Sequence, residues 1–180
     1  MPEKLDYLTP TAMKLLEVFL ADPLIQLHER EVIRHTGVSK GSANAILRLL
    51  SKKSILVRED RGRMAFYRLN LDDPLTRQIK VLLNVQGLRG LVEKVKPHAT
   101  RIIMFGSCAE GTDARESDVD LLVLSDEKGL VKRMTANSEG QFGRRIAPII
   151  IDLNEYVQLK VDNEPLYETI ERGVVLWETG

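Results

Sequence analysis

The chain of 180 residues has a single cysteine, Cys108, and no apolar run long enough for a transmembrane helix, which takes about 18 residues. One cysteine excludes an intramolecular disulfide and is typical of proteins from a reducing compartment. The first ten residues, MPEKLDYLTP, are polar and acidic, whereas a signal peptide would be basic and then apolar. We therefore expect a cytoplasmic protein with no membrane partner.

Several common functional motifs are also missing. The sequence has no glycine fingerprint of the GxGxxG type and no GxxxxGK[ST] loop, which argues against a P-loop enzyme. His28, His35 and His98 are scattered and lack the spacing of metal ligands. We expect these histidines to be structural.

Charge is balanced overall but unevenly distributed. The formal net charge is zero. Residues 30–68 hold ten Lys/Arg against three Asp/Glu, whereas residues 76–180 hold fourteen against sixteen. A basic front section and a mildly acidic back section indicate two modules with different partners.

The front section predicts helices followed by a hairpin. Thr9-Pro10 is typical of a helix start, and we expect this helix to end near Asp22 and a short strand to follow over residues 24–27. Further helices are predicted over residues 29–36 and 40–51. Two strands, 55–58 and 64–69, flank Asp60-Arg61-Gly62-Arg63, which is typical of a hairpin turn.

This order resembles the winged helix-turn-helix family, over roughly residues 8–70. The stretch REVIRHTGVSKGSANAILRLLSKKSILVRE is similar to that family's second helix, turn, recognition helix and first wing strand. The resemblance implies double-stranded DNA as a partner, with the recognition helix in the major groove. Base edges would meet Ser42 and Asn44, and phosphates would meet five cations: Lys40, Arg48, Lys52, Arg61 and Arg63. The alternative interpretation is a solvated basic face on a protein-interaction module.

A helix capped by Asp72-Asp73 is predicted from Pro74 to about Gln86, with Gly87 and Gly90 interrupting it before a short helix to Val95. This segment would link the two modules. We therefore expect a winged helix-turn-helix domain over residues 1–72, a helical linker over 73–97 and a second domain over 98–180.

The central motif of the second module is Gly106-Ser107, followed after ten residues by Asp118-Val119-Asp120. The glycine-serine turn ends one apolar strand (101–105), and the aspartates begin another (119–124). Side chains alternate along a strand, so both carboxylates project from one face and repel each other unless a cation lies between them. Hard oxygen ligands suit Mg²⁺, and a Gly-Ser turn suits phosphate oxygens. The motif therefore predicts a site for nucleoside triphosphate chemistry.

The rest of this module mixes helices and strands, so the fold class is α+β. Helices are predicted over residues 128–140, from Leu153 and over 164–172, with strands over 146–151 and 174–178.

The pattern GSCAEGTDARESDVD resembles the DNA polymerase β-like nucleotidyltransferases, most of all their minimal-nucleotidyltransferase branch, and the final EPLYETIERGVVLWE is similar to the end of that branch. The resemblance covers about residues 88–180 and implies a mixed sheet with flanking helices. It implies that Gly106 and Ser107 bind a nucleoside triphosphate, with ATP expected, and that Asp118 and Asp120 bind Mg²⁺. The nucleotidyl group would pass to a hydroxyl on a protein, nucleic acid or small molecule. The whole chain resembles predicted prokaryotic transcriptional regulators with a nucleotidyltransferase domain, for which we expect a homodimer.

The sequence departs from that family at the third catalytic carboxylate. The family acid would fall near Ile149, and the acid close by is Asp152, an odd number of positions away and therefore facing the other side of a regular strand. Asp152 also begins Asp-Leu-Asn-Glu, which is typical of a capping box. We consider it both as the third catalytic residue and as a helix cap. Glu110 stands where many relatives carry Arg.

Two other functions remain open. In one, the domain is degenerate and senses nucleotide without turnover for a DNA-binding transcriptional regulator. In the other, the protein is an antitoxin-like partner of a helical toxin.

Overall fold

The computed structural model describes residues 4–179, apart from the side chains of residues 139–142. The chain forms two compact units, unit 1 (Met1–Arg77) and unit 2 (Gln78–Gly180). Within the described residues, no helix combines the length and apolar character needed to cross a membrane.

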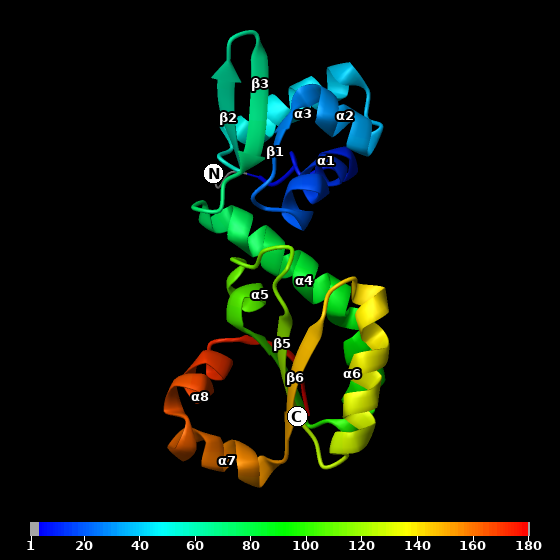
Figure 1. The fold of residues 1–180 in the computed structure, drawn as a ribbon, viewed down its shortest axis with the longest axis vertical. Helices are drawn as coiled ribbons and strands as arrows, with labels where there is room; N and C mark the ends of the chain where they lie inside the picture. The colour runs from blue at the N-terminus through cyan, green and yellow to red at the C-terminus, as the bar shows by residue number, and fades with distance from the viewer. Residues whose placement is uncertain (1–3, 180) are drawn as a thin grey trace. The chain divides into compact units, whose positions relative to one another are not determined.

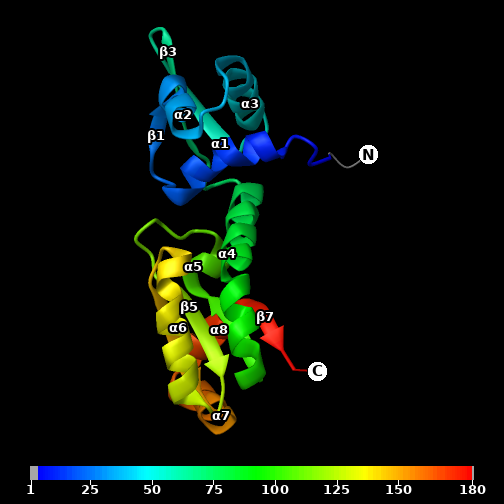
Figure 2. The ribbon, with the colours of Figure 1, turned by 90° about the vertical axis from the view of Figure 1, so that its right-hand side faces the viewer.

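Unit 1 packs helices beside a small antiparallel sheet with the strand order β1-β3-β2. Figures 1 and 2 show α1, α2 and α3 lying together beside this sheet. The described elements are α1 (Pro10–Ala21), β1 (Gln26–His28), α2 (Glu29–Thr36), α3 (Lys40–Lys52), β2 (Leu56–Arg61) and β3 (Met64–Leu69).

Local sequence signals explain where these elements begin and turn. The Thr9 hydroxyl accepts the Ala12 N–H at 3.2 Å and caps α1. Gly37 ends α2 with a left-handed φ of 66°, and Gly62 forms the hairpin turn with a φ of 62°, conformations that glycine adopts without steric strain. Ser39 caps α3 by accepting the Ser42 N–H. These signals therefore fix where α1 and α3 begin and where the hairpin turns, and α3 lies beside β2.

Unit 2 contains a mixed sheet with the order β6-β5-β4-β7, in which β5 pairs in parallel with β6 while the other pairs are antiparallel. The sequence prediction of an α+β module with a mixed sheet and flanking helices is therefore confirmed for this unit. Its elements are α4 (Pro74–Val95), which begins in unit 1, the short 3₁₀ helix η1 (Lys96–His98), β4 (Arg101–Phe105), α5 (Gly106–Glu110), β5 (Val119–Leu124), α6 (Lys128–Phe142), β6 (Ile146–Ile151), α7 (Leu153–Asp162), α8 (Glu164–Glu171) and β7 (Val174–Glu178).

Apolar residues bury both faces of this sheet. On one face, α4 and α6 pack against the strands, with Leu88 and Val131 fully buried beside Leu121. On the other face, α7 and α8 cover the strands, and Tyr156 and Ile170 join that core. Figure 1 shows α6 on one side of the strands and α7 with α8 on the other, and Figure 2 shows α4 and α6 side by side. Burial on both faces explains why the strands are nearly continuous aliphatic runs.

The prediction that Gly87 and Gly90 interrupt the fourth helix is wrong, because α4 runs unbroken from Pro74 to Val95. Each glycine disfavours a helix interior by about 1 kcal/mol. Leu88 and Val95, however, are essentially inaccessible to solvent in the core of unit 2. Fully burying one such side chain stabilises the fold by about 1.5–3 kcal/mol, which outweighs the glycine penalty. Most of α4 is thus part of the second unit's core.

Candidate functional site

The Gly-Ser turn lies directly against Asp120. Phe105, the last residue of β4, pairs with Asp120 on β5, so the chain passes this carboxylate as it turns into α5. Gly106 has a φ of 65°, and a Cβ on it would lie 2.6 Å from Oδ2 of Asp120. Position 106 therefore requires glycine both for its left-handed backbone and for the close approach of the carboxylate. The backbone of the turn and the carboxylate of Asp120 therefore lie next to each other.

Asp118 directly precedes β5 and Asp120 is the second residue of this strand, so the two side chains project to the same side. Both side chains are partly exposed, and that of Asp118 is 39% accessible. Partial burial, and then the negative charge of Asp118, raise the pKa of Asp120. The raised pKa indicates that two negative charges here are unfavourable, which a bound cation would relieve.

Arg145 forms an ion pair with Asp118 of this pair. Its Nη1 lies 3.5 Å from Oδ2 of Asp118, and its side chain is 75% exposed. Such an exposed contact contributes about 0–1 kcal/mol. Arg145 is thus a weak counterion that can leave Asp118 when a stronger one binds.

A buried ion pair holds the loop between α5 and β5. Lys80 Nζ on α4 lies 3.3 Å from Oδ1 of Asp113, and both side chains are almost fully buried. Asn84 Nδ2, one turn along the helix, donates to the same Oδ1 at 3.2 Å and to the Cys108 carbonyl at 3.1 Å. Burial lowers the pKa of the Lys80 ammonium, and the Asp113 carboxylate opposes this shift. The loop that leads to Asp118 is therefore anchored to α4 from within the core.

Arg144 clamps the end of the same loop. Its guanidinium donates to the Ser117 carbonyl at 3.0 and 2.7 Å and to Oδ2 of Asp113 at 2.9 Å. It also donates to Sγ of Cys108 at 3.3 Å. Burial raises the pKa of the Cys108 thiol to about 11, so this residue stays protonated near neutral pH. Arg144 therefore acts on the residue before Asp118, a role that sequence reasoning missed because its partners lie 27 to 36 positions away.

The structure does not bring Asp152 to the other two aspartates. In the parallel β5–β6 pair, Asp120 lies opposite Ala147, and Asp152 follows Ile151 at the far end. Five residues separate these levels, which corresponds to about 16 Å along a strand. Asp152 instead caps α7, where the Glu155 N–H and then the Lys128 ammonium hold its pKa at about 2. Its position fits the cap interpretation of the sequence.

On β6, the strand that pairs with β5, apolar residues lie where the family resemblance implies a third catalytic carboxylate. Ala147 is level with Asp120, and Ile149 is level with Leu122 on the same face of the sheet. The described strand β6, whose sequence is IAPIII, contains no carboxylate. Asp118 and Asp120 are thus the acids that β5 and β6 together offer at this edge.

The residues present fit a magnesium ion bound mainly through phosphate. Among the described residues, no group of three or more His, Cys, Asp or Glu side chains is arranged to hold a metal. Mg²⁺ is commonly bound by one or two carboxylates together with substrate phosphates and water. Asp118 and Asp120 provide that minimal set beside the Gly106-Ser107 backbone.

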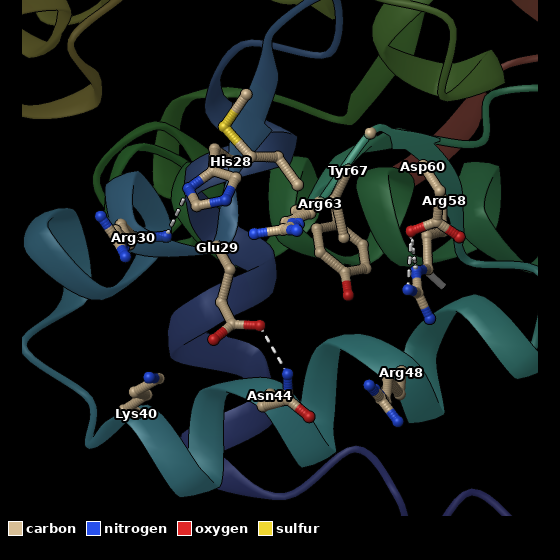
Figure 3. A pocket seen from close by; sticks show the side chains of 13 residues that line it. His28, Glu29, Arg30, Lys40, Asn44, Arg48, Arg58, Asp60, Arg63 and Tyr67 are labelled. Atoms are coloured by element: carbon tan, nitrogen blue, oxygen red, sulfur yellow. Dashed lines mark hydrogen bonds and ion pairs between the residues drawn. The ribbon is translucent and has the colours of Figure 1, made fainter.

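A second polar region lies in unit 1. A cleft of about 360 Å³ opens between α3, the beginning of α2 and the β2–β3 hairpin (Figure 3). Two carboxylates line it, Glu29 and Asp60. Cationic side chains from all of these elements line it as well: Arg30, Lys40, Arg48, Arg58 and Arg63.

The predicted DNA contacts divide between this cleft and other surfaces. Those that line it are Lys40, Asn44, Arg48 and Arg63. Ser42, Lys52 and Arg61 are exposed but are not among its described lining residues. The Arg61 guanidinium donates to Glu59 and Gln26 instead. Arg30 on α2 and Arg58 on β2 also line the cleft. The sequence did not predict them there, because the pattern alone does not tell which side chains of α2 and of the hairpin face α3.

Comparisons with known proteins assign part of the chain. Residues 86–174 match a family model described as "Nucleotidyltransferase domain", and a search of the curated proteins found no match. One similar solved structure is a toxin–antitoxin with AMP-PNP, at 22% identity over 53% of this chain and 74% of that chain, with a TM-score of 0.38. Another, assigned as a nucleotidyltransferase from Sulfolobus solfataricus, is 20% identical over 57% of this chain and 86% of that one, with a TM-score of 0.37.

A third, TrmBL2, an archaeal chromatin protein, is 14% identical over 94% of this chain and 72% of that chain, with a TM-score of 0.32. At these TM-scores the superpositions do not establish a shared overall fold. Strands β4, β5 and β6 of the mixed sheet and the placement of the Gly-Ser turn against Asp120 lie within the region that the family model matches. Residues 86–174 are therefore similar to a nucleotidyltransferase domain.

Proposed function

We propose that unit 2 binds a magnesium–nucleoside triphosphate complex, with ATP as the expected nucleotide, and transfers its nucleotidyl group to a hydroxyl acceptor. The observation that carries this proposal is the approach of the Asp120 carboxylate to Gly106, where even a Cβ would not fit. This approach places the Gly-Ser turn, which suits phosphate oxygens, beside Asp120, whose carboxylate suits Mg²⁺. In the proposal, Gly106 and Ser107 hold the triphosphate, while Asp118 and Asp120 hold Mg²⁺.

The proposed chemistry is an in-line displacement at the α-phosphate. An acceptor hydroxyl oxygen forms a bond to the α-phosphorus, the bond to the β-phosphate bridging oxygen breaks, and pyrophosphate leaves. The hydroxyl proton passes to solvent or to the acceptor's own surroundings, because β6 supplies no carboxylate to take it. Mg²⁺, when bound, neutralises the phosphate charge and orients the reacting groups. The buried Lys80–Asp113 pair and Arg144 keep the loop before Asp118 in position.

A second candidate function follows from the apolar side chains beside Asp120. With Ala147 and Ile149 on the neighbouring strand, the domain would bind nucleotide and metal but lack a base near the acceptor. General base catalysis contributes about 10²–10⁴-fold to a rate. In this alternative, unit 2 is a nucleotide sensor for the rest of the chain.

Incubation of the protein with labelled nucleoside triphosphate, Mg²⁺ and cell extract distinguishes nucleotidyl transfer from nucleotide sensing. Transfer predicts a labelled product that disappears in an Asp118→Ala/Asp120→Ala variant. Sensing predicts bound nucleotide without product. Neither binding nor product in the wild-type protein would reject both.

For unit 1, a winged helix-turn-helix that binds double-stranded DNA is the function that its cationic cleft supports best. Cations from α2, α3 and the hairpin converge there, as phosphate recognition requires. DNA retention at low salt that falls as salt rises tests this function, and no retention at low salt would reject it. A homodimer stays a prediction, which analytical ultracentrifugation of the full chain tests.

A further inference from the structure

Glu29 and Asn44 form a hydrogen-bonded pair within the cationic cleft of unit 1. Asn44 Nδ2 on α3 donates to Oε2 of Glu29, the first residue of α2, at 2.5 Å. Both residues are only partly buried, and both line the cleft. A carboxylate can only accept, so the Asn44 amide must turn its nitrogen toward Glu29 and its Oδ1 away from it. Figure 3 shows this orientation, with Oδ1 pointing away from Glu29.

Cations flank this pair along α3. Lys40 and Arg48 lie four residues before and four residues after Asn44, and therefore on the same face of the helix. Figure 3 shows the two cations on either side of Asn44. Eight residues of helix span about 12 Å, which is about the width of the major groove of DNA. In a DNA complex, Lys40 and Arg48 would therefore meet the backbones on the two sides of the groove, with base edges between them. Asn44 and Glu29 occupy that position.

The other carboxylate of the cleft differs from Glu29 in its partner. Asp60 Oδ1 accepts from Nε and Nη2 of Arg58 at 3.1 and 2.7 Å, so its charge is matched by an adjacent guanidinium. Glu29 instead accepts from the neutral amide of Asn44. Of these two carboxylates, Glu29 is therefore the one whose charge is not matched by the contact it makes.

A carboxylate facing DNA is favourable only where it meets donors. In the major groove, the amino groups of cytosine N4 and adenine N6 donate, whereas guanine O6 and thymine O4 only accept. Glu29 and Oδ1 of Asn44 both accept, so together they would attract an amino group and repel a keto oxygen. Repulsion of the wrong partner is a common source of specificity.

We propose that Glu29 and Asn44 together determine the DNA sequence that this protein selects, by reading a base that carries an exocyclic amino group, adenine or cytosine, in the major groove. The inference rests on the proposed DNA binding of unit 1 and adds a residue from α2 to the base-reading side chains. Lys40 and Arg48 hold phosphates and contribute affinity without sequence preference.

Selection from a random double-stranded DNA pool with the full chain tests the pair. The wild-type protein is expected to enrich sequences with adenine or cytosine at one fixed position. Asn44→Ala and Glu29→Gln are expected to reduce the preference at that position by on the order of 10-fold while retaining DNA. Circular dichroism of each variant establishes that it is folded.

Two controls distinguish the pair from a general charge effect. Glu17→Gln removes the same charge from the exposed surface of α1, and Asp60→Asn removes the other carboxylate of the cleft. Both are expected to leave the selected sequence unchanged. The proposal is overturned if the variants of Glu29 and Asn44 select the same sequence as the wild type, or if the wild type selects none. No retained DNA at low salt would reject the DNA binding itself, and this inference with it.

Discussion

The two polar regions of this protein are built in opposite ways. In unit 2, a few acidic side chains are fixed by a left-handed glycine and by the buried Lys80–Asp113 pair. In unit 1, cations that are mostly exposed share an open cleft. We therefore expect each residue of the first region to be required, whereas the cations of the second region share a long-range attraction. Single changes should therefore act sharply in unit 2 and gradually in unit 1.

The largest expected effect is on stability, at the buried anchor of the loop before Asp118. Asp113→Ala leaves Lys80 buried without its carboxylate partner, which is expected to destabilise the fold by about 3–5 kcal/mol. Denaturant unfolding measures this change. The control Asp126→Ala removes an exposed carboxylate near the other end of β5 and should change stability by less than about 0.5 kcal/mol. Equal losses in the two variants would contradict the anchoring role of Asp113.

The next effect is on nucleotide binding at the Gly-Ser turn. Gly106→Ala places a Cβ against the Asp120 carboxylate on a left-handed backbone, so the affinity for a magnesium–nucleotide complex should fall at least about 10-fold, with a backbone penalty of about 1–2 kcal/mol. Gly90→Ala is the matched control, because a Cβ there has nothing within 4 Å. That control should keep the affinity and raise stability by about 0.4–1 kcal/mol. Unchanged nucleotide affinity in Gly106→Ala would argue against the proposed site.

A smaller effect is expected for each cation of the cleft. Arg48→Ala and Arg63→Ala should each weaken DNA binding several-fold at low salt and reduce the slope of log affinity against log salt by about 1. Arg61→Ala should have less effect, because its guanidinium is bound to Glu59 and Gln26 outside the cleft. Fluorescence anisotropy over a salt series measures all three. An Arg61 effect as large as that of Arg48 would contradict the division of cations between the two surfaces.

The smallest effect concerns the repulsion between the two aspartates. Since burial and Asp118 raise the pKa of folded Asp120, its ionised form is disfavoured in the fold without metal. Asp120→Asn should then stabilise the metal-free protein by up to about 1 kcal/mol, or about 2–4 °C in Tm. This gain in stability should be full at neutral pH. It should disappear as pH falls below the ordinary pKa of aspartate, because Asp120 of the wild-type protein is then protonated in both the folded and the unfolded state. A loss of stability at neutral pH would contradict this interpretation of the pair.

Local patterns predicted the parts of the site that depend on near neighbours. Alternation along a strand placed Asp118 and Asp120 on one side, and the spacing of Asp152 and Glu155 predicted the capping box that the structure contains. The distance between Asp152 and the other aspartates, in contrast, follows from how β5 and β6 pair. No pattern within a single segment predicts this register, so the sequence could not give that distance.

Contacts between distant segments were beyond prediction from the sequence. Lys80 and Asp113 are 33 residues apart, and each alone is typical of an exposed residue. Glu29 and Asn44 lie on different helices, and only the packing of α2 against α3 brings them together. Likewise, α4 passes through two glycines because its apolar face is buried by strands that follow much later in the chain.

Calorimetric titration of ATP into the protein, with Mg²⁺ and with EDTA, tests the magnesium–nucleotide site most directly. We predict binding to the wild-type protein that requires Mg²⁺ and that is lost in Asp118→Ala/Asp120→Ala, while the Asp126→Ala control binds normally. ATP binding of equal strength in EDTA, or in the double variant, would contradict the proposed site.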